Sequence, residues 1–297
     1  FSRNLYASIE DYFYYDVRPT SSNYGNTGLL ELPNARFMPQ ASLRFTFSSS
    51  FPNEYTALTA SPFSWLEATY RYTEVKNLLY GPVTYSGNQS FKDKAFDVHI
   101  KLFNERVYLP QIAFGLRDFA GTGRLASEYL VSTKKIGNVD LTLGLGWGLL
   151  GTAGGVSNPF ESFHDSFKER GTFGGQGGEV NFGDWFSGRT ALFAGVEYDL
   201  NNLGLRFKLE YDTSYPEKTA NVIVNSRFNF GVNYYLSENF NFGAAFERGN
   251  QFRFTFALKG DFSKDTILKP PPKKVASLDS TQKRRAFQEK DIFYRSL

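Results

Sequence analysis

The chain alternates between apolar and polar residues over stretches of about ten positions, the pattern of strands with one apolar and one polar face. The clearest stretches span residues 139–149, 203–212 and 252–260. In the second stretch, Leu and aromatic residues alternate with Arg206, Lys208 and Glu210. About ten residues is the length that a tilted strand needs to cross the hydrocarbon core of a membrane. These stretches therefore predict membrane-spanning strands.

Weaker copies of the same pattern complete a set of twelve predicted strands, so we expect an all-β fold, an antiparallel transmembrane β-barrel of about 12 strands. The predicted strands span residues 41–49, 54–61, 65–74, 95–102, 110–118, 126–135, 139–149, 190–199, 203–212, 226–236, 240–247 and 252–260. Short turns alternate with long loops, as in outer-membrane barrels, and the exceptions are 103–109 and 248–251. The long loops are expected near 75–94, 119–125, 150–189 and 213–225. An even number of strands would leave both termini on the periplasmic side.

The two faces of the predicted strands favour lipid outside and a hydrated lumen inside. A soluble sandwich or lipocalin-like barrel also alternates, but it would have to bury many charges of both signs in a dry core. The residues expected to face lipid are Leu143, Leu145, Trp147, Leu205, Phe207, Leu209, Phe252, Phe254 and Phe256. The residues expected to line the lumen are Glu67, Arg71, Asp97, His99, Lys101, Arg117, Glu197, Arg206, Lys208, Glu210, Arg253 and Lys259.

The ends of the chain differ from its middle. Residues 1–40 show no sustained alternation and are expected to form an N-terminal leader or plug, before a barrel over 41–262. Residues 263–297 contain Pro270-Pro271-Pro272 and several basic residues, which is typical of a linker or tail. The opening residues lack a signal-peptide pattern, so we expect a mature or trimmed form of an exported protein.

Composition narrows the possible functions. There is no cysteine, which excludes disulfides and thiolate metal sites, and no apolar run long enough for a transmembrane helix. The net charge of +3 gives little support to nucleic-acid binding, and we expect no nucleic-acid partner. Balanced charges in the lumen argue against a strongly ion-selective pore, although they suit both a hydrated polysaccharide and a lumen closed by salt bridges.

Motifs for catalysis are weak, and we expect no enzyme, no catalytic residues, no cofactor and no metal. His164 and Ser166 form a His-x-Ser pair in the long loop, which outer-membrane phospholipases use on a strand, but a plain surface loop fits better here. Lumen carboxylates such as Glu67, Asp97 and Glu197 could pair as glycosidase acid and base, although lining the lumen is the simpler role. There is no nucleophile elbow and no zinc-protease motif.

The Gly-rich stretch from Gly171 to Gly188 predicts a flexible loop, long enough within 150–189 to fold into the lumen. Such a loop could form a constriction or gate. Its aromatic residues could then stack on sugar rings: Phe182, Trp185 and Phe186.

A series of motifs across residues 23–236 resembles the YjbH (YbjH) family of exopolysaccharide-biosynthesis outer-membrane proteins, to which the capsule protein GfcD belongs. It includes Asn23–Arg36 (NYGNTGLLELPNAR), Trp65–Tyr72 (WLEATYRY), Leu143–Gly148 (LGLGWG) and Phe193–Tyr198 (FAGVEY). The resemblance implies a role in secretion or assembly of extracellular polysaccharide, and it supplies no catalytic residues. Family members are typically longer, with a second β-rich half, so this chain would correspond to an N-terminal barrel and linker.

We therefore expect a non-enzymatic protein of the Gram-negative outer membrane that assists export or surface assembly of an exopolysaccharide or capsule. The alternatives are a small-solute diffusion pore and an outer-membrane hydrolase such as a phospholipase. The expected partners are outer-membrane lipid, polysaccharide, a second β-rich domain of the same protein and other proteins of the export machinery.

Overall fold

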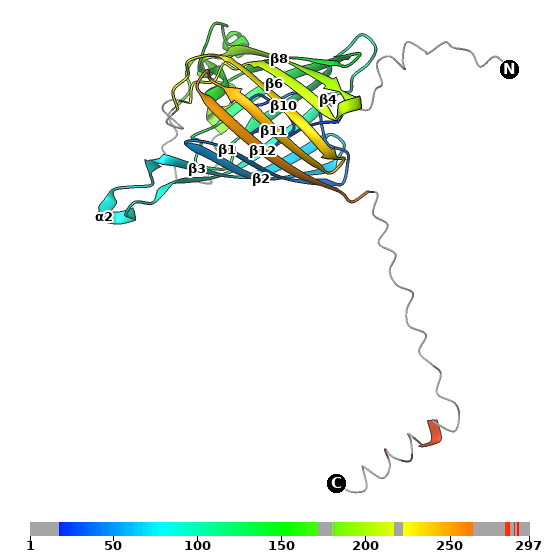
Figure 1. Cartoon of the computed structure of the whole chain (residues 1–297). Helices are drawn as coiled ribbons and strands as arrows, with labels where there is room; N and C mark the ends of the chain where they lie inside the picture. The colour runs from blue at the N-terminus through cyan, green and yellow to red at the C-terminus, as the bar shows by residue number, and fades with distance from the viewer. Residues whose placement is uncertain are drawn as a thin grey trace, which may run out of the picture. The chain divides into compact units, whose positions relative to one another are not determined.

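Twelve antiparallel strands form one closed barrel, in which each strand pairs with its neighbours in the chain and β1 pairs with β12 (Figure 1). The computed structural model describes residues 18–171, 180, 182–216, 222–263, 283–285, 288 and 290. The chain divides into two compact units, 1–264 and 265–297, and the barrel belongs to the first. The expected linker at 263–297 and residues 1–17 of the expected leader lie almost entirely outside the described residues.

The predicted all-β barrel is confirmed, and the expected strands agree closely with those observed. The strands are β1 (Ser42–Ser50), β2 (Asn53–Phe63), β3 (Leu66–Leu79), β4 (Ser90–Phe103), β5 (Gln111–Arg117), β6 (Ser127–Ile136), β7 (Val139–Gly146), β8 (Ala191–Leu200), β9 (Leu205–Tyr211), β10 (Phe228–Ser237), β11 (Phe240–Glu247) and β12 (Gln251–Asp261). Closure leaves no unpaired strand edge, so ladder hydrogen bonds satisfy the backbone all round the barrel.

The connections define two ends of the barrel. The turn end carries the turns at 64–65, 137–138, 201–204 and 238–239, the longer connection at 104–110 and both ends of the barrel's own sequence, at Ser42 and Asp261. The loop end carries the segments 80–89, 118–126, 147–190 and 212–227. Half of the expected loop at 75–94 is strand, because β3 and β4 continue past the wall as a hairpin tipped by α2 (Val83–Ser86), which projects in Figure 1.

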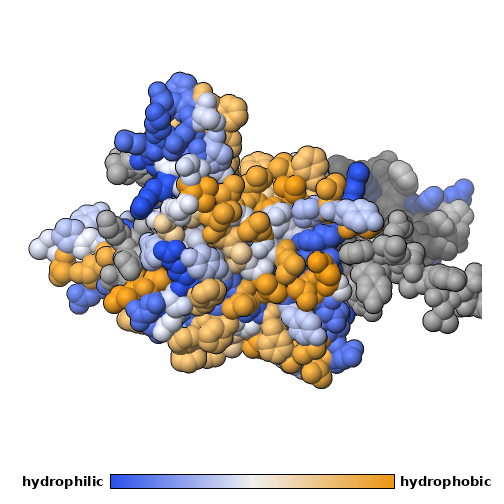
Figure 2. Space-filling view, turned by 90° about the horizontal axis from the view of Figure 1, so that it is seen from above, coloured by the Kyte–Doolittle hydropathy of each residue, from blue (hydrophilic) through white to orange (hydrophobic). Residues whose placement is uncertain are grey.

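The outer surface of the barrel is apolar and exposed. Phe207, Leu209, Phe252 and Phe254 are among its exposed large side chains, and Leu143 is more than half exposed. Figure 2 shows hydrophobic residues gathered over much of one side of the molecule. Exposed apolar side chains gathered in this way mark a surface that contacts a membrane or another protein. Among the described residues, no helix is long and apolar enough to cross a bilayer.

The inner face is polar and nevertheless buried, because the chain before β1 fills the lumen. Every residue from Thr20 to Arg36 is buried. We call Thr20–Met38 the plug segment. It has two isolated antiparallel bridges, Ser21 with Thr27 and Gly28 with Pro33, which fold it into tight turns without a helix.

Candidate functional site in the plugged lumen

The plug segment enters and leaves at the turn end. The hydroxyl of Tyr235, near the end of β10, donates to the carbonyl of Arg18, and the N–H of Ala41 donates to the carbonyl of Ser61 at the end of β2. Between these points the segment reaches the loop end, where Tyr24 packs with Tyr55, Leu125 and Leu149. The plug segment therefore spans the lumen and returns.

Lys208 and Glu210 lie two residues apart on β9 and bind the same turn of the plug segment. Lys208 binds its carbonyl groups and Glu210 binds its N–H groups. The Lys208 ammonium donates to the carbonyls of Gly28 (3.0 Å) and Leu29 (2.6 Å). The Glu210 carboxylate accepts the N–H groups of the next three residues, Leu30, Glu31 and Leu32, at 2.9–3.2 Å. Unpaired buried backbone groups would cost about 1–3 kcal/mol each. The wall thus supplies the hydrogen bonds that this turn cannot make with itself.

Two further wall carboxylates hold the segment from other sides. Glu67 on β3 accepts the N–H and hydroxyl of Thr27 (3.1 and 2.7 Å) and the N–H of Met38 (2.7 Å). Glu197 on β8 accepts the side-chain amide of Asn34 at 2.7 Å. The lumen carboxylates were expected to pair with lumen charges or to form acid–base pairs. Glu197 does pair with Arg206 (3.6 Å) and Lys208 (3.9 Å), but all three carboxylates also bind plug groups. Sequence reasoning missed this role.

The plug segment contributes its own charges to the wall. Glu31 pairs with Arg248 (2.6 Å) and Arg253 (3.5 Å), and it accepts from Asn23 and Tyr24. Burial alone would raise the pKa of Glu31, but the two arginines and these hydrogen bonds hold that pKa at about 2.

Arg36 supplies the opposite charge at the turn end. Its guanidinium pairs with Glu105 (2.5 Å) and Asp140 (2.6 Å). Glu105 lies in the 104–110 connection and Asp140 at the start of β7, so both belong to the turn end. Ion pairs therefore hold the plug segment at both ends of the barrel, through Glu31 at the loop end and Arg36 at the turn end.

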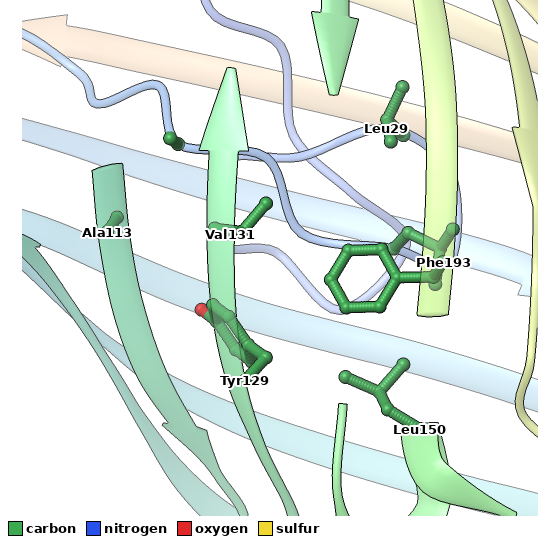
Figure 3. Packing of buried hydrophobic residues seen from close by; sticks show 8 residues of the cluster. Leu29, Ala113, Tyr129, Val131, Leu150 and Phe193 are labelled. Atoms are coloured by element: carbon green, nitrogen blue, oxygen red, sulfur yellow. The ribbon is translucent and has the colours of Figure 1, made fainter. Parts of the chain in front are cut away.

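Apolar contacts add to the polar ones. Leu29, Leu32 and Ala35 of the plug segment form one buried cluster with Phe193 of β8, Leu150 from the loop end, and residues of β5 and β6 (Figure 3). Gly195 leaves the room for Leu29, because a Cβ there would lie 2.6 Å from the Leu29 Cδ1. A glycine facing inward on the wall thus matches a leucine of the plug segment.

Near the loop end, the lumen holds a group of charged residues around Tyr24. The guanidinium carbons of Arg71 and Arg117 lie 4.8 and 4.5 Å from the centre of the Tyr24 ring. Asp97 accepts from Arg71 (3.3 Å) and from the N–H of Asp118 (2.7 Å). Burial, together with the neighbouring Asp93 carboxylate, raises the pKa of Asp118 to about 7.

The remaining expected lumen residues also face inward. Arg206 pairs with Asp199 at 2.5 Å, and Arg253 pairs with Glu247 at 2.7 Å. The His99 ring is buried and stacks on Phe37 at 4.2 Å between centroids. Lys101 and Lys259 are only half-buried, and the Lys101 ammonium lies 5.1 Å from the centre of the Phe37 ring.

Trp147 corrects one expectation, because it does not face lipid. It is 1% exposed, since β7 ends at Gly146 and the chain turns across the loop end as a 3₁₀ helix, η1 (Gly148–Gly151). Its ring packs against Phe160 and Phe186, and its indole N–H donates to Asn158 at 3.1 Å. The apolar alternation of 139–149 continues past the strand, and nothing in that pattern distinguishes a wall position from a loop position.

Asn158 organises the long loop. Its amide donates to the carbonyls of Phe167, Phe186 and Gly188 at 2.8–3.2 Å, while its oxygen accepts from Trp147 and from the N–H of Phe160. Hydrogen bonds of Asn158 therefore hold the described parts of the loop together. Leu149 and Leu150, at the start of the loop, belong to the two buried clusters.

The three expected loop aromatics have different environments. Phe182 is 70% exposed and lies 4.8 Å from Trp185, which is half-buried. Phe186 is half-buried against Trp147, and its N–H donates to Glu128. Of the three, Phe182 and Trp185 form an accessible pair, whereas Phe186 packs inside the loop. Within the Gly-rich stretch, residues 172–179 and 181 lie outside the described residues.

His164 and Ser166 make a local contact. The His164 Nδ1 lies 2.9 Å from the Ser166 hydroxyl, but it also accepts the Ser166 N–H at 3.1 Å as the N-cap of a short 3₁₀ helix, Asp165–Phe167. Both residues are exposed, and the intervening Asp165 pairs with Lys168. The geometry is that of a helix cap. Among the described residues, no group of three or more His, Asp or Glu side chains could hold a metal ion.

Comparison with known proteins gives distant structural likenesses. The barrel is similar to a KdgM porin (7% identity, TM-score 0.38, 73% of this chain and 97% of that one) and to a NanC porin (8% identity, TM-score 0.36, 74% and 98%).

Sequence comparison is closer. The chain is 39% identical over 250 residues to a protein of Escherichia coli (strain K12) described as an uncharacterized lipoprotein YjbH. The match covers 83% of this chain and 36% of that relative, so the chain spans about a third of the relative's length. The model of the YjbH family, described as exopolysaccharide biosynthesis protein YbjH, matches residues 20–293, which include the plug segment and the whole barrel. The expected resemblance is confirmed, and the chain belongs to the YjbH family.

Proposed function

We propose that this chain is a plugged outer-membrane barrel that assists export or surface assembly of an exopolysaccharide or capsule without catalysing a reaction itself. The family's description supplies the polysaccharide class. The exposed apolar side chains of the outer wall support a membrane location, and the buried plug segment supports a lumen that is closed to free diffusion.

The apolar outer wall supports a location in the outer membrane. Side chains such as Phe252 (71% exposed) and Phe254 (66%) would be unfavourable in water. A closed barrel satisfies every backbone group within a bilayer, where open sheets cannot. Four of the six connections at the loop end are long and four of the five at the turn end are short, which resembles the organisation of outer-membrane barrels. This supports our proposal that the turn end and both ends of the barrel sequence face the periplasm.

The buried plug segment is the observation that carries the functional proposal. A general diffusion pore needs a continuous aqueous path, whereas residues Thr20–Arg36 are buried across the lumen and bound by Glu67, Glu197 and Glu210. Each charged contact of this kind contributes about 1.5–3 kcal/mol when well formed. A lumen closed in this way suits a component of an export machinery. Such a component would either open together with its partners or act as a scaffold for them.

The same contacts support a role without catalysis. Of the carboxylates that could have acted as glycosidase acid and base, Glu67, Glu197 and Glu210 accept hydrogen bonds from plug groups, and Asp97 accepts from Arg71 and from the N–H of Asp118. The His164–Ser166 pair serves as a helix cap. We propose outer-membrane lipid, polysaccharide, a second β-rich domain of the same protein and export proteins as partners, and no nucleic acid.

Two measurements test the proposal, one on a deletion strain and one on the purified protein. Deletion of the gene should reduce surface polysaccharide and leave polymer trapped in the periplasm, and the wild-type gene should restore the surface polymer. The purified protein in planar bilayers should show no large constitutive conductance. Normal surface polysaccharide after deletion would rule out the export role. A large, constantly open pore would favour the diffusion-pore alternative.

A further inference from the structure

A basin of about 610 Å³ lies at the loop end, with a basic lining. Its described lining includes Arg124, Arg170, Arg189, Tyr215, Thr152 and Leu149, and none of the described lining residues is acidic. This volume falls within the usual range of small-ligand pockets, about 300–1,000 Å³. The long loop contributes Arg170 and Arg189, and the 118–126 loop contributes Arg124.

Two glycines, Gly148 and Gly154, leave room beside two of the arginines. A Cβ at Gly148 would lie 3.1 Å from the guanidinium carbon of Arg170, and one at Gly154 would lie 3.4 Å from the Arg189 Nε. Both glycines have a positive φ, of 61° and 65°, which other residues rarely adopt. The two guanidinium groups therefore lie close to the backbone at these glycines.

The arginines differ in their partners. Arg170 forms a two-pronged pair with Glu128 at 2.6 and 2.9 Å, so its charge is compensated. Arg189 is exposed and donates to the Thr152 carbonyl at 3.4 Å. In the described part of the chain, no carboxylate lies within ion-pair distance of Arg189. Arg189 thus retains donors for an incoming anion, whereas those of Arg170 are taken up by Glu128.

Tyr215 supplies an aromatic surface beside these charges. Its hydroxyl accepts from Arg227, whose guanidinium carbon lies 4.9 Å from the Tyr215 ring centre. An aromatic ring next to a cation offers an apolar face for a sugar ring and a charge for its substituent.

We propose that this basin binds carboxylated saccharides, with Arg189 pairing with a uronate carboxylate and Tyr215 contacting the sugar ring. Guanidinium matches a carboxylate with two parallel hydrogen bonds. The position favours a polymer at the mouth over a lipid headgroup, because Leu149 lines the basin and also packs on Tyr24 of the plug segment. The basin therefore lies above the lumen and away from the apolar outer wall. This inference rests on the proposed function and names its substrate class as an acidic polysaccharide.

Calorimetric titration of the full chain in detergent micelles tests the site with two matched probes, a β-1,4-linked glucuronate hexamer and the glucose hexamer of the same linkage. We expect the glucuronate hexamer to bind at least tenfold more tightly, and its affinity to fall as salt is raised. Arg189→Gln should weaken glucuronate binding by about fivefold or more, since hydrogen bonds to charged groups are stronger than neutral ones. Lys168→Gln removes an equal charge from the same loop outside the basin and should leave the affinity unchanged.

Three outcomes would overturn the site: equal affinity for both hexamers, no effect of Arg189→Gln, or an equal effect of Lys168→Gln. Competition with inorganic phosphate distinguishes a site for a sugar carboxylate from a site for the phosphate of a glycolipid. Competition by phosphate beyond that of chloride at equal ionic strength would assign the basin to phosphate and also overturn the proposal.

Failure here is distinguishable from failure of the export role. Lost surface polysaccharide in the deletion strain without uronate binding would refute only the basin. Uronate binding with normal surface polysaccharide would refute only the export role.

Discussion

Glu31 of the plug segment and Arg248 of the β11–β12 turn form an ion pair in which both side chains are buried and the Oε2–Nη2 distance is 2.6 Å. Arg253, Asn23 and Tyr24 also bind the Glu31 carboxylate. The pair joins a segment that precedes the barrel to the last hairpin of the wall. It is a contact across more than two hundred residues of sequence.

Replacing Glu31 by Ala should therefore loosen the plug. The substitution removes the carboxylate that pairs with the buried Arg248, and Arg253 keeps only its pair with Glu247. Loss of one member of a buried pair costs about 3–5 kcal/mol. We expect a lower melting temperature in micelles and increased conductance in planar bilayers. Glu54→Ala breaks the partly exposed Glu54–Lys76 pair and is the matched control. Equal effects of the two variants on conductance would contradict a plug-specific role.

The fit between Gly195 and Leu29 predicts a coupling between two substitutions. Gly195→Ala introduces a Cβ 2.6 Å from the Leu29 Cδ1, so it should destabilise the protein. Leu29→Ala removes the clash but leaves a cavity. In the double variant the two costs should be less than additive by about 1–3 kcal/mol, as for other residues in contact. Denaturant unfolding of the four proteins measures the coupling, and strict additivity would place Leu29 elsewhere.

Asp118 predicts a pH dependence at the loop end. Its pKa is raised to about 7, so the folded state binds a proton that the unfolded state has released. The stabilisation is present below the ordinary value of 3.8 and is lost as the pH rises to about 7. Asp118→Asn should flatten the melting temperature between pH 4 and 7, whereas Asp165→Asn, on an exposed side chain, should not. An unchanged slope in Asp118→Asn would assign the effect to another group.

Asn158→Ala should loosen the long loop 147–190 at the loop end. The substitution removes hydrogen bonds to Trp147, Phe167, Phe186 and Gly188, and several buried groups then lack a partner at about 1–3 kcal/mol each. We expect faster proteolysis between residues 147 and 190 and little change in the barrel strands. Ser162→Ala, which removes an exposed local hydrogen bond, is the control. Proteolysis at the wild-type rate in Asn158→Ala would show that other contacts hold the loop.

The His164–Ser166 pair predicts a structural effect only. His164→Ala should lower the stability of this loop through the lost cap of the short 3₁₀ helix. Phospholipid hydrolysis by the purified protein should stay at background in wild type, His164→Ala and Ser166→Ala. Hydrolysis that disappears in both variants would instead support the hydrolase alternative.

The sequence by itself determined the wall of this protein. Period-two alternation is a local property of a strand, so runs such as Leu203–Asp212 specified the strands, their apolar face and the barrel they close. The same alternation failed at Trp147, because an apolar residue that continues the period can equally be buried under a loop.

Only the tertiary structure decided what the interior does. Lys208, Glu210 and Glu67 were identifiable as inward-facing, but their partners are backbone groups about 30 to 180 residues away, and backbone groups leave no side-chain signature. Asn158 and Arg189 carried no pattern for the same reason. The alternation states which way a side chain points, whereas the group it meets depends on how the closed barrel brings distant segments together.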